Sequence, residues 1–198
     1  MAARNGYAAL VKQRAEGKTK RRRLDDYETP EDKTAYLVDA VKFKGPALEP
    51  AAGSGRMARA LAQFGKLKVT RADIKTGQNF LKRTATFAGD IITNPPYRDG
   101  LADAFTRHAL KLADGRVAML METKFLHGDK RASALFHETP PELILIIPER
   151  IYFFEGSGKN AKPIPAQFFN HVWIVWPDRK TRQRGGYQTK TVWARPDF

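Results

Sequence analysis

The stretch Glu49-Pro50-Ala51-Ala52-Gly53-Ser54-Gly55 is the strongest indication of fold class in this chain. The apolar residues 46–48 precede it, and Met57, Leu61 and Phe64 follow at the spacing of one helix face. Glycine at positions 53 and 55 lets the backbone turn sharply and come close to a ligand. Strand, glycine turn and helix in this order predict the first unit of an α/β nucleotide-binding fold.

The next apolar stretch, residues 67–73, predicts a second strand that ends in a carboxylate. Asp73 stands 18 residues after Gly55, where an acidic side chain can accept hydrogen bonds from both hydroxyls of a ribose. The three-glycine motif of dinucleotide sites is absent, because Arg56-Met57-Ala58 follows Gly55. The turn therefore predicts a site for a nucleoside without a pyrophosphate.

A second motif, Asn94-Pro95-Pro96-Tyr97, follows the apolar run at residues 91–93. The prolines fix an extended bend, so the Asn94 side-chain oxygen and the Pro95 carbonyl can converge on one NH₂ group. Tyr97 supplies a flat face on which a base taken out of its duplex can stack. The motif predicts a pocket for a planar amine; the alternative is an ordinary proline turn after a strand.

The rest of the chain alternates predicted helices and strands, which favours one α/β sheet. Leu101, Phe105 and Leu112 recur at helical spacing, and residues 132–136 suggest a short helix. Strands are predicted at residues 116–121 and 143–147, and residues 171–176 are expected to form the last one. The glycine- and lysine-rich segment 155–165 is either a loop near the substrate or a plain connection between strands.

Composition sets limits on the function. A chain of 198 residues, 42% hydrophobic, suits one catalytic domain, and without a membrane-spanning run or signal sequence we expect a soluble cytoplasmic protein. The lack of cysteine excludes disulfides and the thiol chemistry of cytosine C5 methylation, and makes a zinc site improbable. The four histidines lack ligand spacing, so no metal is expected.

The net charge of +14 is concentrated at the two ends of the chain. Residues 1–24 hold eight basic side chains and one acidic one, and residues 177–198 hold six and two. We expect a basic arm at 1–24, a catalytic domain at 25–176 and a basic tail at 177–198, with nucleic acid as partner. A solvated tail is the alternative for the N-terminal arm. The candidate nucleic-acid contacts are Arg21, Arg22, Arg23, Arg98, Lys124, Arg131, Lys159 and Lys162.

Over residues 25–176 these motifs resemble the S-adenosylmethionine-dependent amino-methyltransferases, most closely the DNA adenine N6-methyltransferases. The resemblance implies a Rossmann-like seven-stranded sheet with helices on both faces. It implies that Asp73 binds the cofactor ribose, that Ile74 lies against its adenine, and that residues 26–30 close over its methionine part. Asn79 stands where the family usually has an acid that bonds the adenine amine. The implied cofactor residues are Tyr27, Thr29, Pro30, Glu49, Pro50, Ala51, Gly53, Gly55, Asp73, Ile74, Asn79 and Phe80, and the implied catalytic residues are Asn94, Pro95, Pro96 and Tyr97.

The same resemblance implies direct methyl transfer to adenine N6 in DNA. Enzymes of this kind usually carry a long target-recognition domain, and 22 residues follow Trp176, so we expect short or relaxed sequence specificity. Small enzymes of this type occur on phages, where they suit protection of DNA against restriction in a bacterial host. The alternatives are methylation of a ribosomal RNA amine, methylation of glutamine in release factors, and a non-catalytic nucleic-acid-binding protein. The oligomeric state is left open.

Overall fold

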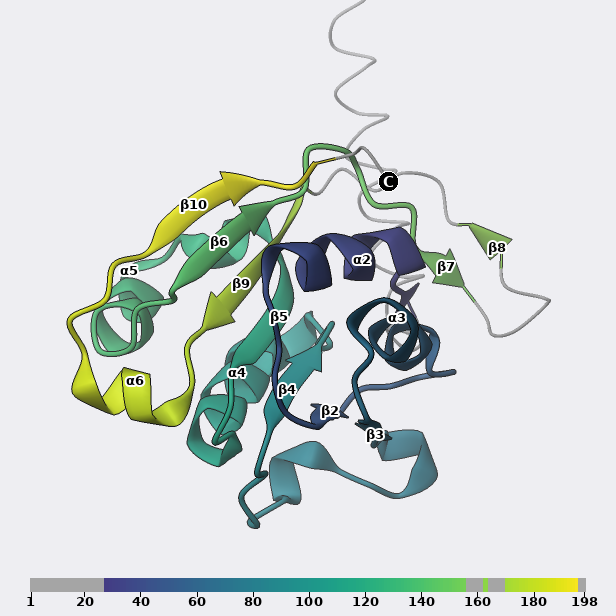
Figure 1. Cartoon of the computed structure of the whole chain (residues 1–198), viewed down its shortest axis with the longest axis horizontal. Coiled ribbons are helices and arrows are strands. Elements are labelled where there is room, and N and C mark those ends of the chain that lie inside the picture. Colours follow the sequence, from purple (N-terminus) through teal and green to yellow (C-terminus); the bar gives the residue numbers. More distant parts are fainter. Residues whose placement is uncertain (1–26, 156–161, 164–169, 196–198) are drawn as a thin grey trace, which may run out of the picture.

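The computed structural model describes residues 27–155, 162–163 and 170–195 (Figure 1). Its centre is a seven-stranded sheet in the order β10-β6-β9-β5-β4-β2-β3. Strand β9 runs antiparallel to both of its neighbours, and the other adjacent pairs are parallel. The strands are β2 (Ala47–Glu49), β3 (Val69–Arg71), β4 (Asp90–Thr93), β5 (Val117–Glu122), β6 (Leu143–Ile146), β9 (His171–Trp176) and β10 (Lys190–Trp193). A small second sheet has the order β1 (Tyr27–Glu28), β7 (Phe154–Glu155), β8 (Lys162–Pro163).

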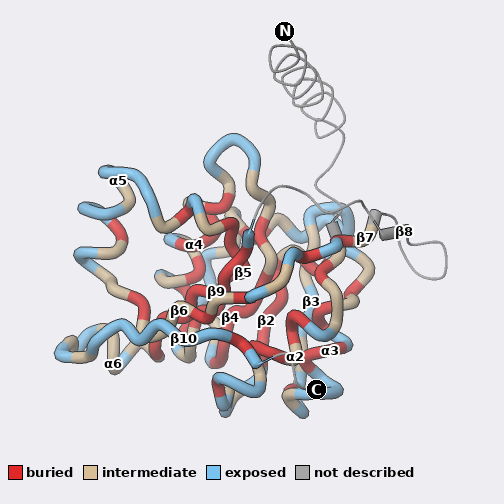
Figure 2. Tube along the Cα trace, turned by 90° about the horizontal axis from the view of Figure 1, so that it is seen from above, coloured by how far each residue is buried: buried red, intermediate tan, exposed pale blue. Residues whose placement is uncertain are grey.

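Helices cover both faces of the large sheet, as the sequence predicted. Helices α2 (Glu31–Ala40) and α3 (Arg56–Gly65) pack on one face, and α4 (Leu101–Leu112) packs on the other with the short α5 (Asp129–Arg131) and η5 (Ala132–Phe136). Every residue of β4, β5 and β9 is buried, so the centre of the sheet forms the core (Figure 2). Single 3₁₀ turns complete the fold at η1 (Ile74–Thr76), η2 (Phe80–Lys82), η3 (Arg98–Gly100) and η4 (Thr123–Leu126).

Three details of the sequence prediction are wrong. The strand expected over residues 67–73 is confined to β3, and Phe64, expected on the apolar face of α3, is 44% exposed. Residues 171–176 are not the last strand, because β10 follows and pairs with β6 in parallel. All four residues of β10 are exposed, so this edge strand lacks the apolar run by which a buried strand is recognised.

The segment after residue 176 is fastened to the end of α4. Helix α6 (Arg179–Arg184) places the Arg182 guanidinium against main-chain carbonyls: Nη2 donates to Ala113 O at 2.8 Å and Leu110 O at 3.2 Å, and Nη1 donates to Gly115 O at 3.2 Å and to Pro177 O. The last carbonyls of a helix have no partner within the helix, and a cation there also suits the helix dipole. Residues 177–193 are therefore an integral part of the sheet and its packing.

A half-buried ion pair joins α2 to the segment after β6. Lys33 Nζ contacts the Glu149 carboxylate, and Tyr36 Oη donates to Glu149 Oε1 at 2.6 Å. Burial disfavours the charge on Glu149, but hydrogen bonds from Lys33 and Tyr36 outweigh it and lower the pKa of this carboxyl below its ordinary value. Ionised Glu149 thus stabilises the folded chain.

This pair predicts a loss of stability in acid. A group whose pKa is lower in the folded chain than in the unfolded chain adds stability above its unfolded pKa and loses it as the pH falls through its folded pKa. We expect Glu149→Gln to flatten the decline in the free energy of unfolding below the ordinary carboxyl pKa of 4.5. Urea unfolding between neutral and acidic pH measures this, with the exposed Glu138→Gln as control. The same acid dependence in wild type and Glu149→Gln would contradict the prediction.

No helix in the described ranges has the length and apolar character needed to cross a membrane.

Candidate active site

A pocket of about 480 Å³ lies at the carboxyl ends of β2 and β4. From β2 the chain passes to β3 on one side, and β4 lies on the other side of β2, so the pocket occupies the position where the strand order reverses. Open α/β sheets bind their ligands at such positions. Its lining includes the predicted Thr29, Glu49, Pro50, Ala51, Gly53, Asp73, Ile74, Asn79 and Phe80, together with Asn94, Pro95, Pro96 and Tyr97.

The glycine turn forms one wall of this pocket. Gly53 and Gly55 have φ angles of +51° and +85°, a region that favours glycine. A Cβ atom added to Gly55 would lie 2.4 Å from Arg71 Nη1, whereas one added to Gly53 would meet no atom within 4 Å. Gly55 is also the N-cap of α3. The turn therefore opens the backbone at Gly53 to the pocket and starts the helix at Gly55.

Asp73 connects the glycine turn to the end of β3. Its Oδ2 accepts a hydrogen bond from Gly53 N at 2.8 Å, and its Oδ1 accepts one from Lys75 N at 2.8 Å. Each carboxylate oxygen keeps a second acceptor position. Ile74, next in the chain, is 68% exposed although it is a large apolar side chain on the pocket wall. Together the two residues offer acceptors and an apolar surface to one ligand.

Asn79 has a local role that the sequence did not reveal. Its Oδ1 accepts a hydrogen bond from Leu81 N at 3.0 Å and so caps η2, the turn that places buried Phe80 beneath the pocket. The oxygen expected to meet a ligand amine thus already has a backbone donor.

The Asn94 amide is held at both ends. Its Nδ2 donates to Thr29 Oγ1 at 3.1 Å, and its Oδ1 accepts from Tyr97 Oη at 2.5 Å. Tyr97 Oη also lies 2.9 Å from Leu120 O. A phenol has one proton to donate, so Tyr97 can donate it to Leu120 O when another donor bonds to Asn94 Oδ1. The amide is thereby oriented before any substrate arrives.

Glu49 is the most buried carboxyl of the site, with 2% of its surface exposed. Burial raises its pKa well above the ordinary value, against a backbone hydrogen bond at Ala58 and the nearby charge of Arg71. Its Oε2 has no hydrogen-bond partner among the described residues. An amine or cation in the pocket would give this oxygen a partner and favour the ionised form.

Arg56 is a pocket residue that sequence reasoning missed. Its Nε lies 3.0 Å from Glu28 Oε2, and its guanidinium lies 4.4 Å from the centre of the Phe154 ring. It thus joins the first turn of α3 to the small sheet at β1 and β7. A cation in the first turn of a helix opposes the helix dipole, and this anomaly could have identified it.

Other predicted residues lie outside the pocket lining or outside the described part. Pro30 and Gly55 do not line the pocket. Arg21, Arg22, Arg23 and Lys159 lie outside the described residues, as do the side chains of Tyr27 and Lys162.

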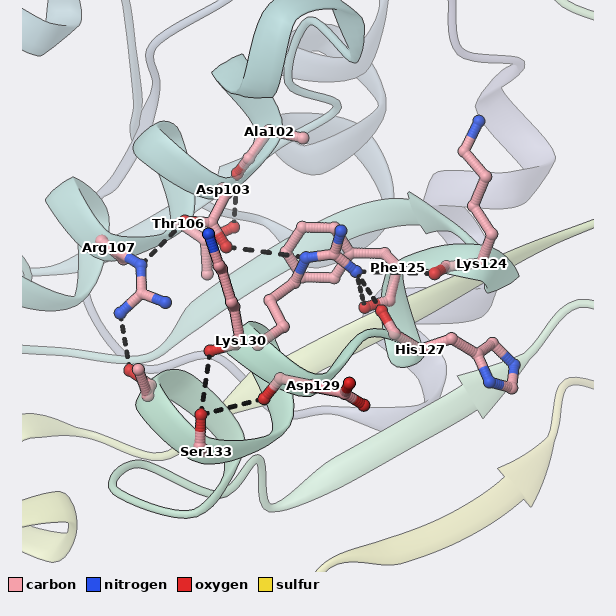
Figure 3. Close-up of polar contacts among 12 residues, drawn as sticks. Ala102, Asp103, Thr106, Arg107, Lys124, Phe125, His127, Asp129, Lys130 and Ser133 are labelled. Atoms are coloured by element: carbon pink, nitrogen blue, oxygen red, sulfur yellow. Dashed lines mark hydrogen bonds and ion pairs between the residues drawn. The ribbon is translucent and has the colours of Figure 1, made fainter.

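The predicted phosphate-binding residues differ in their surroundings. Arg98 is exposed at the pocket rim, and Lys124 is 67% exposed, with an ion pair to Glu122. Arg131 bonds to its own loop instead: Nη1 donates to Phe125 O at 2.6 Å and to His127 O at 2.5 Å. Figure 3 shows Phe125 and His127 in this loop. Arg131 therefore holds its own loop, and a contact with nucleic acid stays a prediction for all three residues.

Comparison with known proteins places the fold. No family model and no curated protein matches the chain. Solved structures do match. A predicted RNA methyltransferase from Pyrococcus horikoshii has a TM-score of 0.51 at 13% identity, covering 77% of this chain and 86% of the other. The methyltransferase subunit of a type I restriction-modification system from Streptococcus thermophilus has a TM-score of 0.52 at 15% identity, covering 79% and 46%. The M protein of the EcoKI type I restriction enzyme has a TM-score of 0.50 at 12% identity, covering 89% and 50%.

These similarities define the class. The chain has the Rossmann-like methyltransferase fold, as the sequence predicted. It spans about half the length of the two restriction-modification subunits that it resembles.

Proposed function

We propose that this chain is an S-adenosylmethionine-dependent DNA methyltransferase that acts on the N6 amine of adenine, with short or relaxed sequence specificity. The observation that carries the proposal is the meeting of two motifs in one pocket: the glycine turn with Asp73, and the segment from Asn94 to Tyr97. The first suits a nucleoside and the second suits a planar amine.

The residues of the pocket fit S-adenosylmethionine. Asp73 has acceptor positions for ribose hydroxyls, exposed Ile74 offers a surface for a flat base, and the unpartnered Glu49 Oε2 suits an amine. We assign the methionine part to the open backbone at Gly53 and to buried Thr29, which both line the pocket. When bound, the cofactor would supply an electrophilic methyl group on a positively charged sulfur.

The chain's own residues then hold the target amine in line and exclude water. Asn94 Oδ1 accepts a hydrogen bond from the amine, and the Pro95 carbonyl is the second acceptor. Both draw on the amine hydrogens, which favours the tetrahedral nitrogen that can attack. Pro96 fixes the bend, and the Tyr97 ring faces the base. No base has to remove a proton before attack, because the amine loses its extra proton during or after transfer.

DNA is the proposed macromolecular partner. Exposed Arg98 lines the pocket and provides positive charge there, and Lys124, although paired with Glu122, is a second candidate contact with the DNA backbone. The basic residues outside the described ranges add to the net charge of +14. Two of the similar structures belong to restriction-modification systems, which supports a role in protecting DNA from restriction, in a bacterial cell or a phage-infected host.

Transfer of radiolabelled methyl groups tests the proposal. The protein is incubated with labelled cofactor and unmethylated duplex DNA, single-stranded DNA, ribosomal RNA or a release factor, and the products are hydrolysed and separated. We expect N6-methyladenine in DNA of many unrelated sequences. Label in protein alone, or no label in any substrate, would overturn the proposal.

A ribosomal RNA amine is the second candidate. The similarity to the predicted RNA methyltransferase from Pyrococcus horikoshii favours it, and positive charge attracts either nucleic acid. Label confined to RNA in the same assay would select this function and leave the proposed cofactor site unchanged.

The cofactor role of Asp73 has a separate test. We expect Asp73→Ala to weaken S-adenosylmethionine binding about tenfold or more, because a charge-assisted hydrogen bond contributes about 1.5–3 kcal/mol. Asp73→Asn keeps one acceptor and should retain part of the affinity. Isothermal titration calorimetry measures both, and Asp39→Ala, on exposed α2 surface, is the control. Wild-type affinity in Asp73→Ala would place the ribose elsewhere.

A further inference from the structure

A second groove runs along β10, far from the pocket in the strand order. It has a volume of about 960 Å³ and lies between the end of α2 and the edge of the large sheet. Leu143 and Leu145 of β6 and Val192 of β10 are apolar residues in its lining. Because Val192 pairs with Leu145 across the sheet, these side chains share the face on which α2 packs. The groove thus begins on the part of this sheet face that α2 leaves open. It continues around the edge strand β10 to Trp193, which pairs with Ile146 of the other face.

The lining of the groove is strongly basic. Lys42, Lys44, Lys190 and Arg195 are exposed along it, and no ion pair involves any of them in the described part of the chain. Arg116 is neutralised by Glu142, whose Oε1 lies 2.7 Å from Arg116 Nε. Asp39 is then the remaining acidic residue of the lining. The uncompensated charge suits a polyanion.

An exposed tryptophan stands at one end of this groove. Trp193 is 64% exposed, whereas Trp173 and Trp176 are fully buried and donate their indole N–H groups to main-chain carbonyls. Burying an indole ring contributes a large favourable hydrophobic free energy, and most of the Trp193 ring stays unburied in the described structure. Exposed aromatic rings beside basic side chains are the means by which proteins hold single-stranded nucleic acid.

The topology places Trp193 at the carboxyl end of the sheet, where the candidate active site also lies. Strand β10 is parallel to β6, and both run in the direction of β4. Trp193, the last residue of β10, therefore lies at the same end of the sheet as Asn94. Four strand spacings separate β10 from β4, which is about 19 Å. A stacked strand rises about 3.4 Å per nucleotide, so this distance is about six nucleotides.

We propose that the β10 groove binds the DNA strand that carries the target adenine, with Trp193 stacking on a base about six nucleotides from it. The lysines of the groove hold the backbone beyond that base. This inference rests on the proposed function for the identity of the strand, and it adds a second, sequence-tolerant contact that keeps the DNA on the protein while the target base is turned out.

Binding of single-stranded DNA of two lengths tests the groove. Fluorescein-labelled strands of 4 and 16 nucleotides, each with one adenine, are titrated with protein at fixed salt and followed by anisotropy. Only the longer strand can reach Trp193 from the pocket. The affinity gain is the ratio of the affinity for the 16-nucleotide strand to that for the 4-nucleotide strand. We expect Trp193→Ala to reduce this ratio about 5- to 150-fold, because one stacked base is lost. Trp193→Phe should retain most of the ratio.

A matched control and a direct signal accompany this measurement. Phe64→Ala removes another exposed aromatic ring, on α3 outside the groove, and should bind both strands as the wild type does. Because the other two tryptophans are fully buried, quenching of tryptophan fluorescence by the 16-nucleotide strand reports on Trp193 and should be absent in Trp193→Phe.

Three results would overturn the proposal. The first is wild-type binding of the 16-nucleotide strand by Trp193→Ala. The second is a Trp193 dependence seen with a 16-nucleotide RNA and not with DNA. The third is a shift from dimer to monomer in sedimentation of Trp193→Ala without DNA, which would assign the groove to a second copy of the chain. The assay needs no cofactor and no turnover, so a protein that fails to methylate DNA can still confirm the groove, and a methylating enzyme can still refute it.

Discussion

Replacing Asn94 with alanine is expected to lower the rate of methyl transfer to adenine by about two to three orders of magnitude, the effect of removing one preorganised group from a transition state. The reason is geometric. Asn94 is bonded by Thr29 on one side and Tyr97 on the other, so its oxygen is oriented before the amine arrives. Alanine leaves the amine without this acceptor. Single-turnover methyl transfer with saturating cofactor and DNA measures the chemical step.

The controls for Asn94→Ala separate chemistry from folding and cofactor binding. The variant should bind S-adenosylmethionine with nearly wild-type affinity, because the glycine turn and Asp73 follow other strands, β2 and β3. Its urea midpoint should show that the fold is retained. Undiminished turnover in the variant would show that Asn94 takes no part in the mechanism. It would also contradict the assignment of Asn94-Pro95-Pro96-Tyr97 as the pocket for the target amine.

The second large effect concerns stability. Arg182→Ala is expected to lower the free energy of unfolding by about 2–4 kcal/mol, because main-chain carbonyls at the end of α4 lose their donor in a partly buried place. The loss includes the packing of α6 against α4. Urea unfolding with an unchanged slope would attribute the effect to the folded state.

Arg184→Ala is the matched control, since Arg184 belongs to the same helix and is exposed. Its effect should stay within about 0.5 kcal/mol, as for most surface substitutions. Equal stability of the Arg182 and Arg184 variants would show that the contacts of Arg182 add little to the fold.

Sequence patterns with short-range physical causes were predicted well. Strands β4, β5 and β9 are fully buried and each contains a run of apolar residues, and the glycine turn needs backbone angles that few other residues adopt. Each could therefore be located without a structure. The pocket follows, because parallel strands bring their carboxyl ends together. That is why the glycine turn, Asp73 and Asn94, far apart in sequence, line one cavity.

The misses depend on contacts between distant residues. Strand β10 is short and exposed, and its place in the sheet depends on β6 and on the contacts of Arg182 with α4. Arg131 has the positive charge expected of a phosphate-binding residue, but its guanidinium donates hydrogen bonds to carbonyls of its own loop. Arg56 was read as an interruption of a glycine motif, and its partner Glu28 is 28 residues away. A pattern within one segment contains no information about such partners.

The ion pair of Arg56 with Glu28 couples occupancy of the pocket to the stability of the small sheet. Strand pairing of β1 with β7 brings residues 27–28 against residues 154–155, and Arg56 ties that pair to the first turn of α3, where Glu28 and Arg56 also line the pocket. A ligand that stabilises the contact of Arg56 with the β1–β7 pair must bind more tightly when that contact is formed, and by the same free energy, since coupling is reciprocal. Filling the pocket should therefore slow amide hydrogen exchange in two stretches of chain separated by more than a hundred positions, whichever nucleoside is bound.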